Sequence, residues 1–230
     1  MKRIYQIRGK KWQYIDATDL SESHIKKTIE SYDKGAIEYA EEWEWSDKVQ
    51  QRTKRDYLFP FIEETKIDDS ILVVGSGTGR DLMILHSRRY QCLGIDKSSG
   101  MLEESVKRGV TCPLVNEDIM TFRGVRGSFD GILCESALEH IQKAKLQDIF
   151  HRFCDWLRYD GVLLMRIRMG DGRVFRSWDK VGERFFTSYT EDEIKRIVNK
   201  NGKMKVISTH IDPHIDPTRP SFYSILFQRL

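Results

Sequence analysis

Three glycines stand two residues apart after an apolar run: Gly75, Gly77 and Gly79 follow Ile71–Val74. Glycine allows the left-handed backbone angles of a tight turn and lets the main chain approach a ligand closely. A helix starting directly after the turn would offer free N–H groups to an anion, here a carboxylate. A dinucleotide-binding loop would carry its third glycine at position 80, which is Arg80 in this chain, so the spacing disfavours a nicotinamide cofactor.

Acidic side chains follow the next three apolar runs of the sequence. Asp96 ends the second run, about twenty residues beyond the glycine turn, where a carboxylate can accept hydrogen bonds from both hydroxyls of a ribose. Asp118 and Ile119 follow the third run and could reach a base, and Glu135 ends the fourth. Because ligands of open α/β sheets bind beyond the carboxyl ends of the strands, we expect all of them to meet in one crevice.

Short β-rich runs alternate with helix-like stretches from Ser70 onward. The predicted strands are Ile71–Val74, Gln91–Ile95, Val110–Val115, Gly131–Cys134 and Val162–Ile167, and the predicted helices are Arg80–Arg89, Gly100–Arg108 and Lys143–Leu157. This alternation predicts a doubly wound α/β fold whose mostly parallel sheet is covered on both faces. A further helix follows the capping box Thr190–Glu193, and the last two runs, Met204–Ile211 and Phe222–Gln228, suit an antiparallel pair that brings the sheet to seven strands.

The residues before this alternation read as a polar, helical extension. One helix face is predicted to carry Ile25, Ile29, Tyr32, Ala36, Tyr39, Ala40 and Trp43. Gly35 is placed to interrupt that helix, and a second helix is expected over Lys48–Glu64. We therefore expect residues 1–66 to form a helical extension or lid packed on a core of residues 67–230.

Composition excludes several classes of protein. Hydrophobic residues make up 40% of the chain and charged residues 32%, with a net charge of +3, which fits a globular protein without a strong attraction to nucleic acid. The apolar runs are too short to cross a bilayer and the N-terminus has no apolar signal core, so we expect a cytoplasmic protein. Cys92, Cys112, Cys134 and Cys154 lack paired spacing, and neither a metal nor a disulfide framework is expected.

From about Ile29 to Arg229, these motifs resemble those of the class I S-adenosylmethionine-dependent methyltransferases, whose fold is Rossmann-like. The matching positions are the glycines of the turn, Gly94-Ile-Asp96-Lys97-Ser-Ser-Gly-Met101-Leu, the strand-end Asp118, Phe129-Asp-Gly131, and Arg184-Phe-Phe-Thr-Ser-Tyr189. The resemblance implies S-adenosylmethionine as cofactor and S-adenosylhomocysteine as product. It also implies that the glycines line the methionine portion, that Asp96 holds the ribose hydroxyls, that Lys97 and Met101 flank the adenine, and that Asp118 with Ile119 binds the adenine edge.

The N-terminal helix is similar to a segment that closes over the cofactor in related enzymes. Those enzymes carry Tyr-Asp-x-x-Ala-x-x-Tyr, and this chain has Tyr32-Asp-Lys-Gly-Ala-Ile-Glu-Tyr39, one residue shorter before the alanine. The resemblance thus implies a lid in which Tyr39 covers the cofactor, although an apolar stripe of this kind also suits a helix packed in the core.

One position departs from the family pattern. The acidic residue that usually stands two positions before the first glycine is replaced by Val73. This removes a polar anchor near the amino end of the cofactor, and Glu135 is a candidate to compensate. The replacement also leaves open a non-catalytic, cofactor-binding partner subunit.

Methyl transfer from a sulfonium is an in-line displacement that depends mainly on positioning, and a general base is needed only for a protonated nucleophile. The candidates for that base are His140, Glu135 and Tyr32, with Tyr39 as a further one, although His140 also suits a purely packing role.

We expect a small-molecule acceptor attacked at N or O. Between Arg166 and Arg184 cations outnumber acids, which suits either a solvated loop or an acidic acceptor held by Arg166, Arg168 and Arg184. An RNA acceptor such as tRNA is the alternative that this bias supports.

Overall fold

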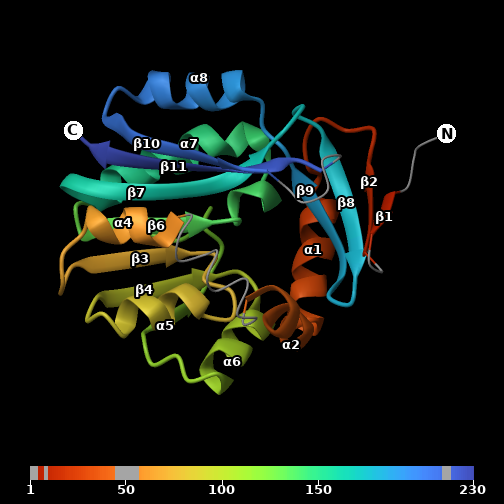
Figure 1. The fold of residues 1–230 in the computed structure, drawn as a ribbon, viewed down its shortest axis with the longest axis horizontal. Coiled ribbons are helices and arrows are strands. Elements are labelled where there is room, and N and C mark those ends of the chain that lie inside the picture. The colour runs from red at the N-terminus through yellow and green to blue at the C-terminus, as the bar shows by residue number, and fades with distance from the viewer. Residues whose placement is uncertain (1–4, 8–9, 45–56, 214–218) are drawn as a thin grey trace.

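The computed structural model describes residues 5–7, 10–44, 57–213 and 219–230, and a seven-stranded sheet forms its centre (Figure 1). The strands of this large sheet are β3 (Ser70–Val74), β4 (Gln91–Asp96), β5 (Leu114–Asn116), β6 (Phe129–Glu135), β7 (Leu157–Met169), β10 (Met204–Asp212) and β11 (Ser221–Arg229). Their spatial order is β10-β11-β7-β6-β3-β4-β5, and β11 runs antiparallel to both of its neighbours. The predicted doubly wound, mostly parallel sheet with an antiparallel C-terminal strand is confirmed.

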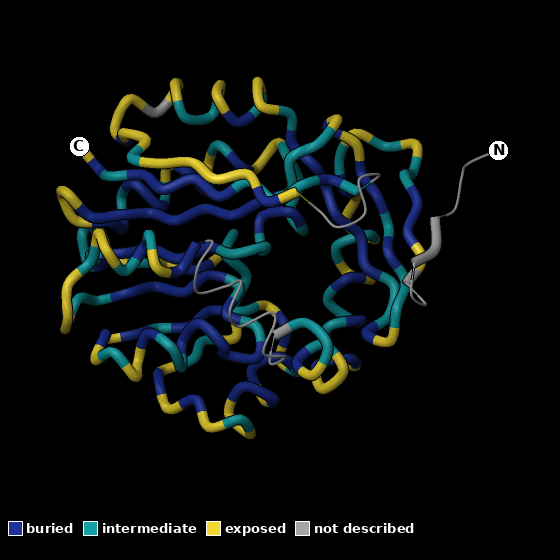
Figure 2. Tube along the Cα trace, viewed as in Figure 1, coloured by how far each residue is buried: buried dark blue, intermediate teal, exposed yellow. Residues whose placement is uncertain are grey.

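Helices cover both faces of the large sheet, as continuous apolar strands require. They are α4 (Phe59–Glu63), α5 (Arg80–His86), α6 (Ser99–Lys107), α7 (Lys143–Trp156) and α8 (Glu191–Asn201), and a short 3-10 helix, η3 (Leu138–His140), precedes α7. Alternate residues of β3 enter different apolar clusters: Leu72 and Val74 pack with α7, whereas Ile71 and Val73 pack on the side of α4 and α5. The central strands are accordingly buried along much of their length (Figure 2).

Element boundaries follow local signals in most places. Thr190 caps α8 with a complete capping box, and Gly202 ends it in the left-handed conformation. Strand β5 is shorter than predicted, because the strand begins only after Pro113; Val110 and Cys112, which precede it, are buried beside α5 instead.

A second, four-stranded sheet was not predicted. It is built from β1 (Tyr5–Ile7), β2 (Lys10–Tyr14), β8 (Val174–Asp179) and β9 (Gly182–Thr187) in that spatial order, with every pair antiparallel. The N-terminal extension is therefore not wholly helical, because Trp12 packs against Phe175 and Phe186 of a hairpin far along the chain. The same hairpin includes much of the stretch from Arg166 to Arg184, for which a solvated loop was one of the two interpretations.

The predicted N-terminal helix is present and stands between the two sheets (Figure 1). It comprises α1 (Glu22–Lys34), α2 (Ala36–Tyr39) and the π-helical turn η1 (Ala40–Glu44), with the predicted interruption at Gly35. Ser31 Oγ donates to the carbonyl of Glu183 at 2.7 Å and so fixes α1 to β9. Of the second predicted helix, Lys48–Glu64, residues 48–56 lie outside the described residues, and α4 forms its C-terminal end.

Candidate functional site

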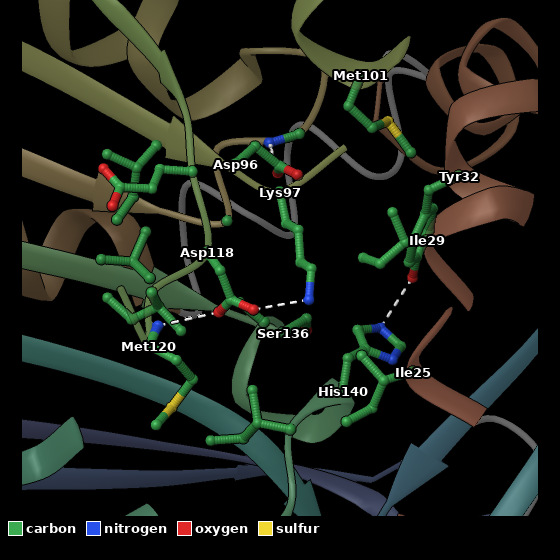
Figure 3. Close-up of a pocket in the computed structure, with 18 of the residues that line it drawn as sticks. Ile25, Ile29, Tyr32, Asp96, Lys97, Met101, Asp118, Met120, Ser136 and His140 are labelled. Carbon is green, nitrogen blue, oxygen red and sulfur yellow. Dashed lines mark hydrogen bonds and ion pairs between the residues drawn. The ribbon is translucent and has the colours of Figure 1, made fainter. Parts of the chain in front are cut away.

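A cavity of about 360 Å³ lies at the carboxyl ends of the parallel strands, between the large sheet and α1 (Figure 3). Its walls come from the β3–α5 turn, the ends of β4 and β6, the loop after β5, and one face of α1. The cavity is lined by these predicted site residues: Tyr32, Tyr39, Gly75, Gly77, Asp96, Lys97, Met101, Asp118, Ile119, Glu135 and His140. Segments distant in the sequence thus meet in one crevice, as the positions at the strand ends predict.

The Asp96 carboxylate is fixed at the centre of the cavity by backbone hydrogen bonds. Its Oδ2 accepts from the Gly77 N–H and its Oδ1 from the Ser98 N–H, both at 2.8 Å. Burial raises the pKa of Asp96, while these two N–H groups act in the opposite direction. A carboxylate held in this way keeps lone pairs that can accept hydrogen bonds from a diol.

Lys97 reaches across the cavity to Asp118 (Figure 3), and its Nζ lies 2.6 Å from Asp118 Oδ2. The other oxygen, Oδ1, accepts from the Met120 N–H at 2.9 Å. Met101 and Ile119 line the same end of the cavity. Apolar side chains beside hydrogen-bonding groups form an arrangement that can hold a planar base and bind its polar edge.

Gly79 does not line the cavity, in contrast to the other two glycines of the turn. It takes a left-handed conformation with φ 86° at the start of α5. A Cβ at this position would lie 2.3 Å from Cγ2 of Val110 and 2.5 Å from Oγ of Ser105. The expectation that all three glycines contact the cofactor is corrected for Gly79, whose small size serves the packing of α5 against α6.

Tyr32 and His140 are hydrogen-bonded to each other at the α1 side of the cavity (Figure 3), with 2.9 Å between Tyr32 Oη and His140 Nε2. His140 Nδ1 lies 2.8 Å from the carbonyl oxygen of Phe185. Since a carbonyl can only accept, Nδ1 carries the proton, and Nε2 accepts from the Tyr32 hydroxyl. Burial lowers the pKa of His140 to about 3 and raises that of Tyr32 to about 12, so both groups are neutral at pH 7.

Apolar side chains surround this hydrogen-bonded pair. Ile25, Ile29 and Tyr32 lie three or four residues apart on α1 and all face the cavity, together with Ile141. The sequence placed the first three on one helix face, but the same stripe suited a core helix equally well. Ile141, Gln142 and Lys145, at the start of α7, were not predicted, since nothing in their spacing marks them.

Arg166, Arg168 and Arg184 do not line the cavity. Arg166 lies 2.6 Å from Glu135 and Arg168 lies 3.3 Å from Glu139. Arg184 pairs with Asp179 and stacks over the Tyr32 ring, 5.4 Å from its centroid. The expectation that these three arginines hold an acidic acceptor is corrected, because each is paired with an acidic side chain inside the protein.

Val73 and Glu135 lie on adjacent strands. Val73 is buried in the apolar cluster on the α4–α5 side of the large sheet and does not line the cavity. Glu135 ends β6 and does line it. An acidic side chain therefore reaches the methionine end of the predicted cofactor site from the neighbouring strand.

The remaining sequence expectations concern metals, thiols and membranes. Cys92, Cys112, Cys134 and Cys154 are all buried free thiols. Among the residues that the structure describes, no three His, Cys, Asp or Glu side chains are grouped so as to hold a metal ion. Within the described ranges, no helix combines the length and the apolar character that a membrane crossing needs.

Residues 71–161 match the family described as "Methyltransferase domain". No curated protein matches the chain. Among solved structures, the 1,6-didemethyltoxoflavin-N1-methyltransferase of Burkholderia thailandensis, bound to 1,6-didemethyltoxoflavin and S-adenosylhomocysteine, is similar with a TM-score of 0.71 at 16% identity, covering 99% of this chain and 98% of that one.

Two further structures share the fold. The S-adenosylmethionine-dependent methyltransferase of Methanosarcina mazei has a TM-score of 0.66 at 17% identity, covering 76% of this chain and 99% of its own. The one from Clostridium acetobutylicum has a TM-score of 0.61 at 19% identity, covering 86% and 98%. Residues 71–161 thus match a methyltransferase domain, and the chain shares the fold of solved S-adenosylmethionine-dependent methyltransferases.

Proposed function

We propose that this chain is a class I methyltransferase that transfers the methyl group of S-adenosylmethionine to a nitrogen or oxygen atom of a small-molecule acceptor bound between α1 and η3. The observation that carries the proposal is the cavity itself, whose two ends differ in chemistry. One end gathers the glycine turn with Asp96 and Asp118, and the other gathers an apolar face of α1 around Tyr32 and His140. A charged nucleoside cofactor and a less polar acceptor would each meet suitable groups.

At the cofactor end, the residues fit the parts of S-adenosylmethionine in the order in which they occur along the cavity. The main chain at Gly75 and Gly77 lies beside the methionine portion, and the Asp96 carboxylate accepts from the ribose hydroxyls. Met101 and Ile119 enclose the adenine, while Asp118 meets its edge. Lys97 Nζ lies 2.6 Å from Asp118 Oδ2, and a carboxylate oxygen has a second lone pair with which it can also accept from adenine.

At the acceptor end, the protein's task is to orient the nucleophile and exclude water. The bound cofactor supplies an activated methyl group on a sulfonium. The Tyr32 hydroxyl donates its hydrogen bond to His140 Nε2, so its oxygen presents lone pairs that can accept from an O–H or N–H of the acceptor. His140 then holds and orients Tyr32, and its low pKa makes it a weak base.

The groups at this end favour an acceptor with a mainly apolar body. Tyr32 and His140 are neutral and Ile25, Ile29 and Ile141 form much of the wall, while Glu22 and Lys145, also in the lining, carry opposite charges. The neighbour from Burkholderia thailandensis acts on a small molecule, as this proposal expects here. RNA loses its support, since Arg166, Arg168 and Arg184 are engaged in internal ion pairs.

The experiment is a calorimetric titration with S-adenosylhomocysteine, carried out on the wild type, on Asp96→Ala and on Asp148→Ala. We expect the wild type and Asp148→Ala, an exposed change on α7, to bind with the same affinity, and Asp96→Ala to lose binding. A panel of neutral phenols and aromatic amines then tests the acceptor class by methyl transfer. Binding that survives in Asp96→Ala would contradict the proposed cofactor position.

A further inference from the structure

The end of β3 offers no acidic side chain to a positively charged ligand group. Val73 is 4% exposed and packs among apolar residues such as Leu82 and Leu133. The neighbouring strand supplies such a group, because Val74 pairs with Cys134 in parallel register and Glu135 follows directly. Glu135 therefore lies level with the first glycine of the turn and lines the cavity there.

The Glu135 carboxylate is held through one of its two oxygens. Its Oε1 lies 2.6 Å from Arg166 Nη1 and accepts from the Ser136 hydroxyl at 2.8 Å. The other oxygen, Oε2, lies 3.8 Å from Arg80 Nη2, beyond hydrogen-bond distance. Both short hydrogen bonds thus go to the same oxygen, and Oε2 keeps its capacity to accept from a ligand.

Two arginines lie beside Glu135, and each is also paired with another acid. Arg166 pairs with Asp212 at 3.0 Å, and Arg80 pairs with Asp81 at 2.9 Å. Burial alone would raise the pKa of Glu135, but the charges of Arg166 and Arg80 outweigh it and keep the carboxyl ionised. An ionised carboxylate that lines the cavity can pair with an ammonium group of a ligand.

We propose that Glu135 binds the α-ammonium group of S-adenosylmethionine, a role that Val73 cannot fill, and that Arg166 is the residue that positions the carboxylate. The inference rests on the proposed function, since it requires the cofactor to bind in this cavity. The α-ammonium is the part of the cofactor that is both positively charged and able to donate hydrogen bonds. Arg166 is fixed in turn by Asp212 and by the Phe222 ring, whose centroid is 3.7 Å from its guanidinium carbon.

The test compares two ligands that share the nucleoside. S-adenosylhomocysteine carries the amino-acid portion, and 5′-methylthioadenosine lacks it. Calorimetric titration of Glu135→Gln is expected to show the Kd for S-adenosylhomocysteine raised tenfold or more, as loss of a hydrogen bond to a charged group implies, with the Kd for 5′-methylthioadenosine unchanged. The matched control, Glu183→Gln in β9, is expected to leave both constants unchanged.

Each other outcome is decisive. If Glu135→Gln leaves both constants unchanged, or weakens both ligands equally, the assignment of Glu135 is overturned while the proposed function stands. If the wild type binds neither ligand, the proposed function itself is wrong. Should Glu135→Gln fail to fold, Glu135→Asp keeps a charge opposite Arg166 but withdraws it from the cavity, and the same selective loss of S-adenosylhomocysteine affinity is expected.

Discussion

At the scale of single residues, the Tyr32 hydroxyl is the group that we expect to meet the acceptor. Replacing Tyr32 by Phe leaves His140 Nε2 and the acceptor's O–H or N–H each without a partner. An unsatisfied buried polar group costs about 1–3 kcal/mol, so we expect kcat/KM to fall roughly fivefold to a hundredfold, measured with any acceptor that the panel identifies. The Kd for S-adenosylhomocysteine should not change.

The exposed Tyr159 provides the control, since it is 76% exposed and lies outside the cavity lining. Tyr159→Phe should behave like the wild type in both measurements. A Tyr32→Phe enzyme with full activity would show that the hydroxyl does not contact the acceptor.

His140 should make the stability of the protein depend on pH. Burial lowers its folded-state pKa to about 3, whereas a histidine in the unfolded chain titrates near pH 6.5. The unfolded state therefore binds more protons between these values, and the stability that neutral His140 contributes is present above pH 6.5 and lost as pH falls towards 3. The expected loss is about 1.4 kcal/mol per pH unit in that window.

The measurement is urea unfolding of the wild type and His140→Gln at pH 7, 6 and 5. Glu139 acts in the opposite direction, since burial raises its pKa to about 7 and its contribution is lost as pH rises through that value. Because both proteins keep Glu139, Arg168, Arg184 and Tyr32, the difference in unfolding free energy isolates His140. A difference that does not vary with pH would contradict the buried, neutral state.

Single residues of the site were predictable where residues adjacent in the sequence determine their position. Asp96 follows β4 directly, so its position at the strand end could be inferred from the apolar run before it. Arg166 was misread for the opposite reason. Its partners Glu135 and Asp212 lie far away in the sequence and meet it only through the pairing of β6, β7, β11 and β10.

At the scale of elements, the start of α6 joins the cofactor end of the cavity to α1. Ser98 Oγ donates to Asp33 Oδ1 at 2.7 Å and accepts from the Met101 N–H at 3.2 Å. The Ser98 N–H donates a hydrogen bond to Asp96 Oδ1. Ser98 thus caps α6, orients Asp96 and fastens α1. The two helices also approach closely, because a Cβ on Gly100 would lie 2.2 Å from the carbonyl oxygen of Asp33.

We expect Ser98→Ala to lower the unfolding free energy by about 1–2 kcal/mol, the usual effect of losing a helix cap, and also to weaken S-adenosylhomocysteine binding. The second effect arises because α1 loses one hydrogen bond to the start of α6 and keeps only the weaker one from the Gly100 N–H to Asp33 Oδ1, at 3.1 Å. Thr190→Ala is the matched control: Thr190 caps α8 in the same way but lies outside the cavity lining, so only stability should fall. Urea unfolding and titration calorimetry measure the two quantities, and equal binding by both variants would show that α1 does not depend on this bond.

Elements were predictable where their own residues carry the signal. The strands of the large sheet are continuous apolar runs, and α8 has a capping box and a terminal glycine. Strand β2 has neither mark: Lys10–Tyr14 mixes polar and aromatic residues, and the strand forms because it pairs with β8, more than 160 residues further along the chain. A long-range partner of that kind leaves no trace in a local pattern.

At the scale of the whole molecule, the cavity lies between the large sheet and α1, and α1 in turn packs on the small sheet. The large sheet supplies the glycine turn, Asp96 and Asp118, while α1 is fastened to the small sheet by backbone contacts with β9. The small sheet itself combines the N-terminal strands with the β8–β9 hairpin. The proposed boundary at residue 66 therefore separates two segments of sequence that fold against each other. We infer that the acceptor wall, by which we mean the face of α1 that lines the cavity, depends on both segments.

Trp12→Ala tests whether the small sheet can loosen without the large one. Trp12 is 2% exposed and packs edge-on against Phe175, with 6.2 Å between the ring centroids. Removing such a buried ring costs about 3–5 kcal/mol, and we expect the loss to fall on the small sheet and α1, seen as faster hydrogen exchange in α1, β8 and β9. Affinity for S-adenosylhomocysteine should fall much less than acceptor turnover, because the proposed cofactor contacts lie mainly on the large sheet.

Trp156→Ala, on α7, should instead speed exchange in the large sheet. Equal loss of protection across both sheets in Trp12→Ala would mean that the two sheets and α1 unfold as one unit, so that the acceptor wall cannot open independently of the cofactor site.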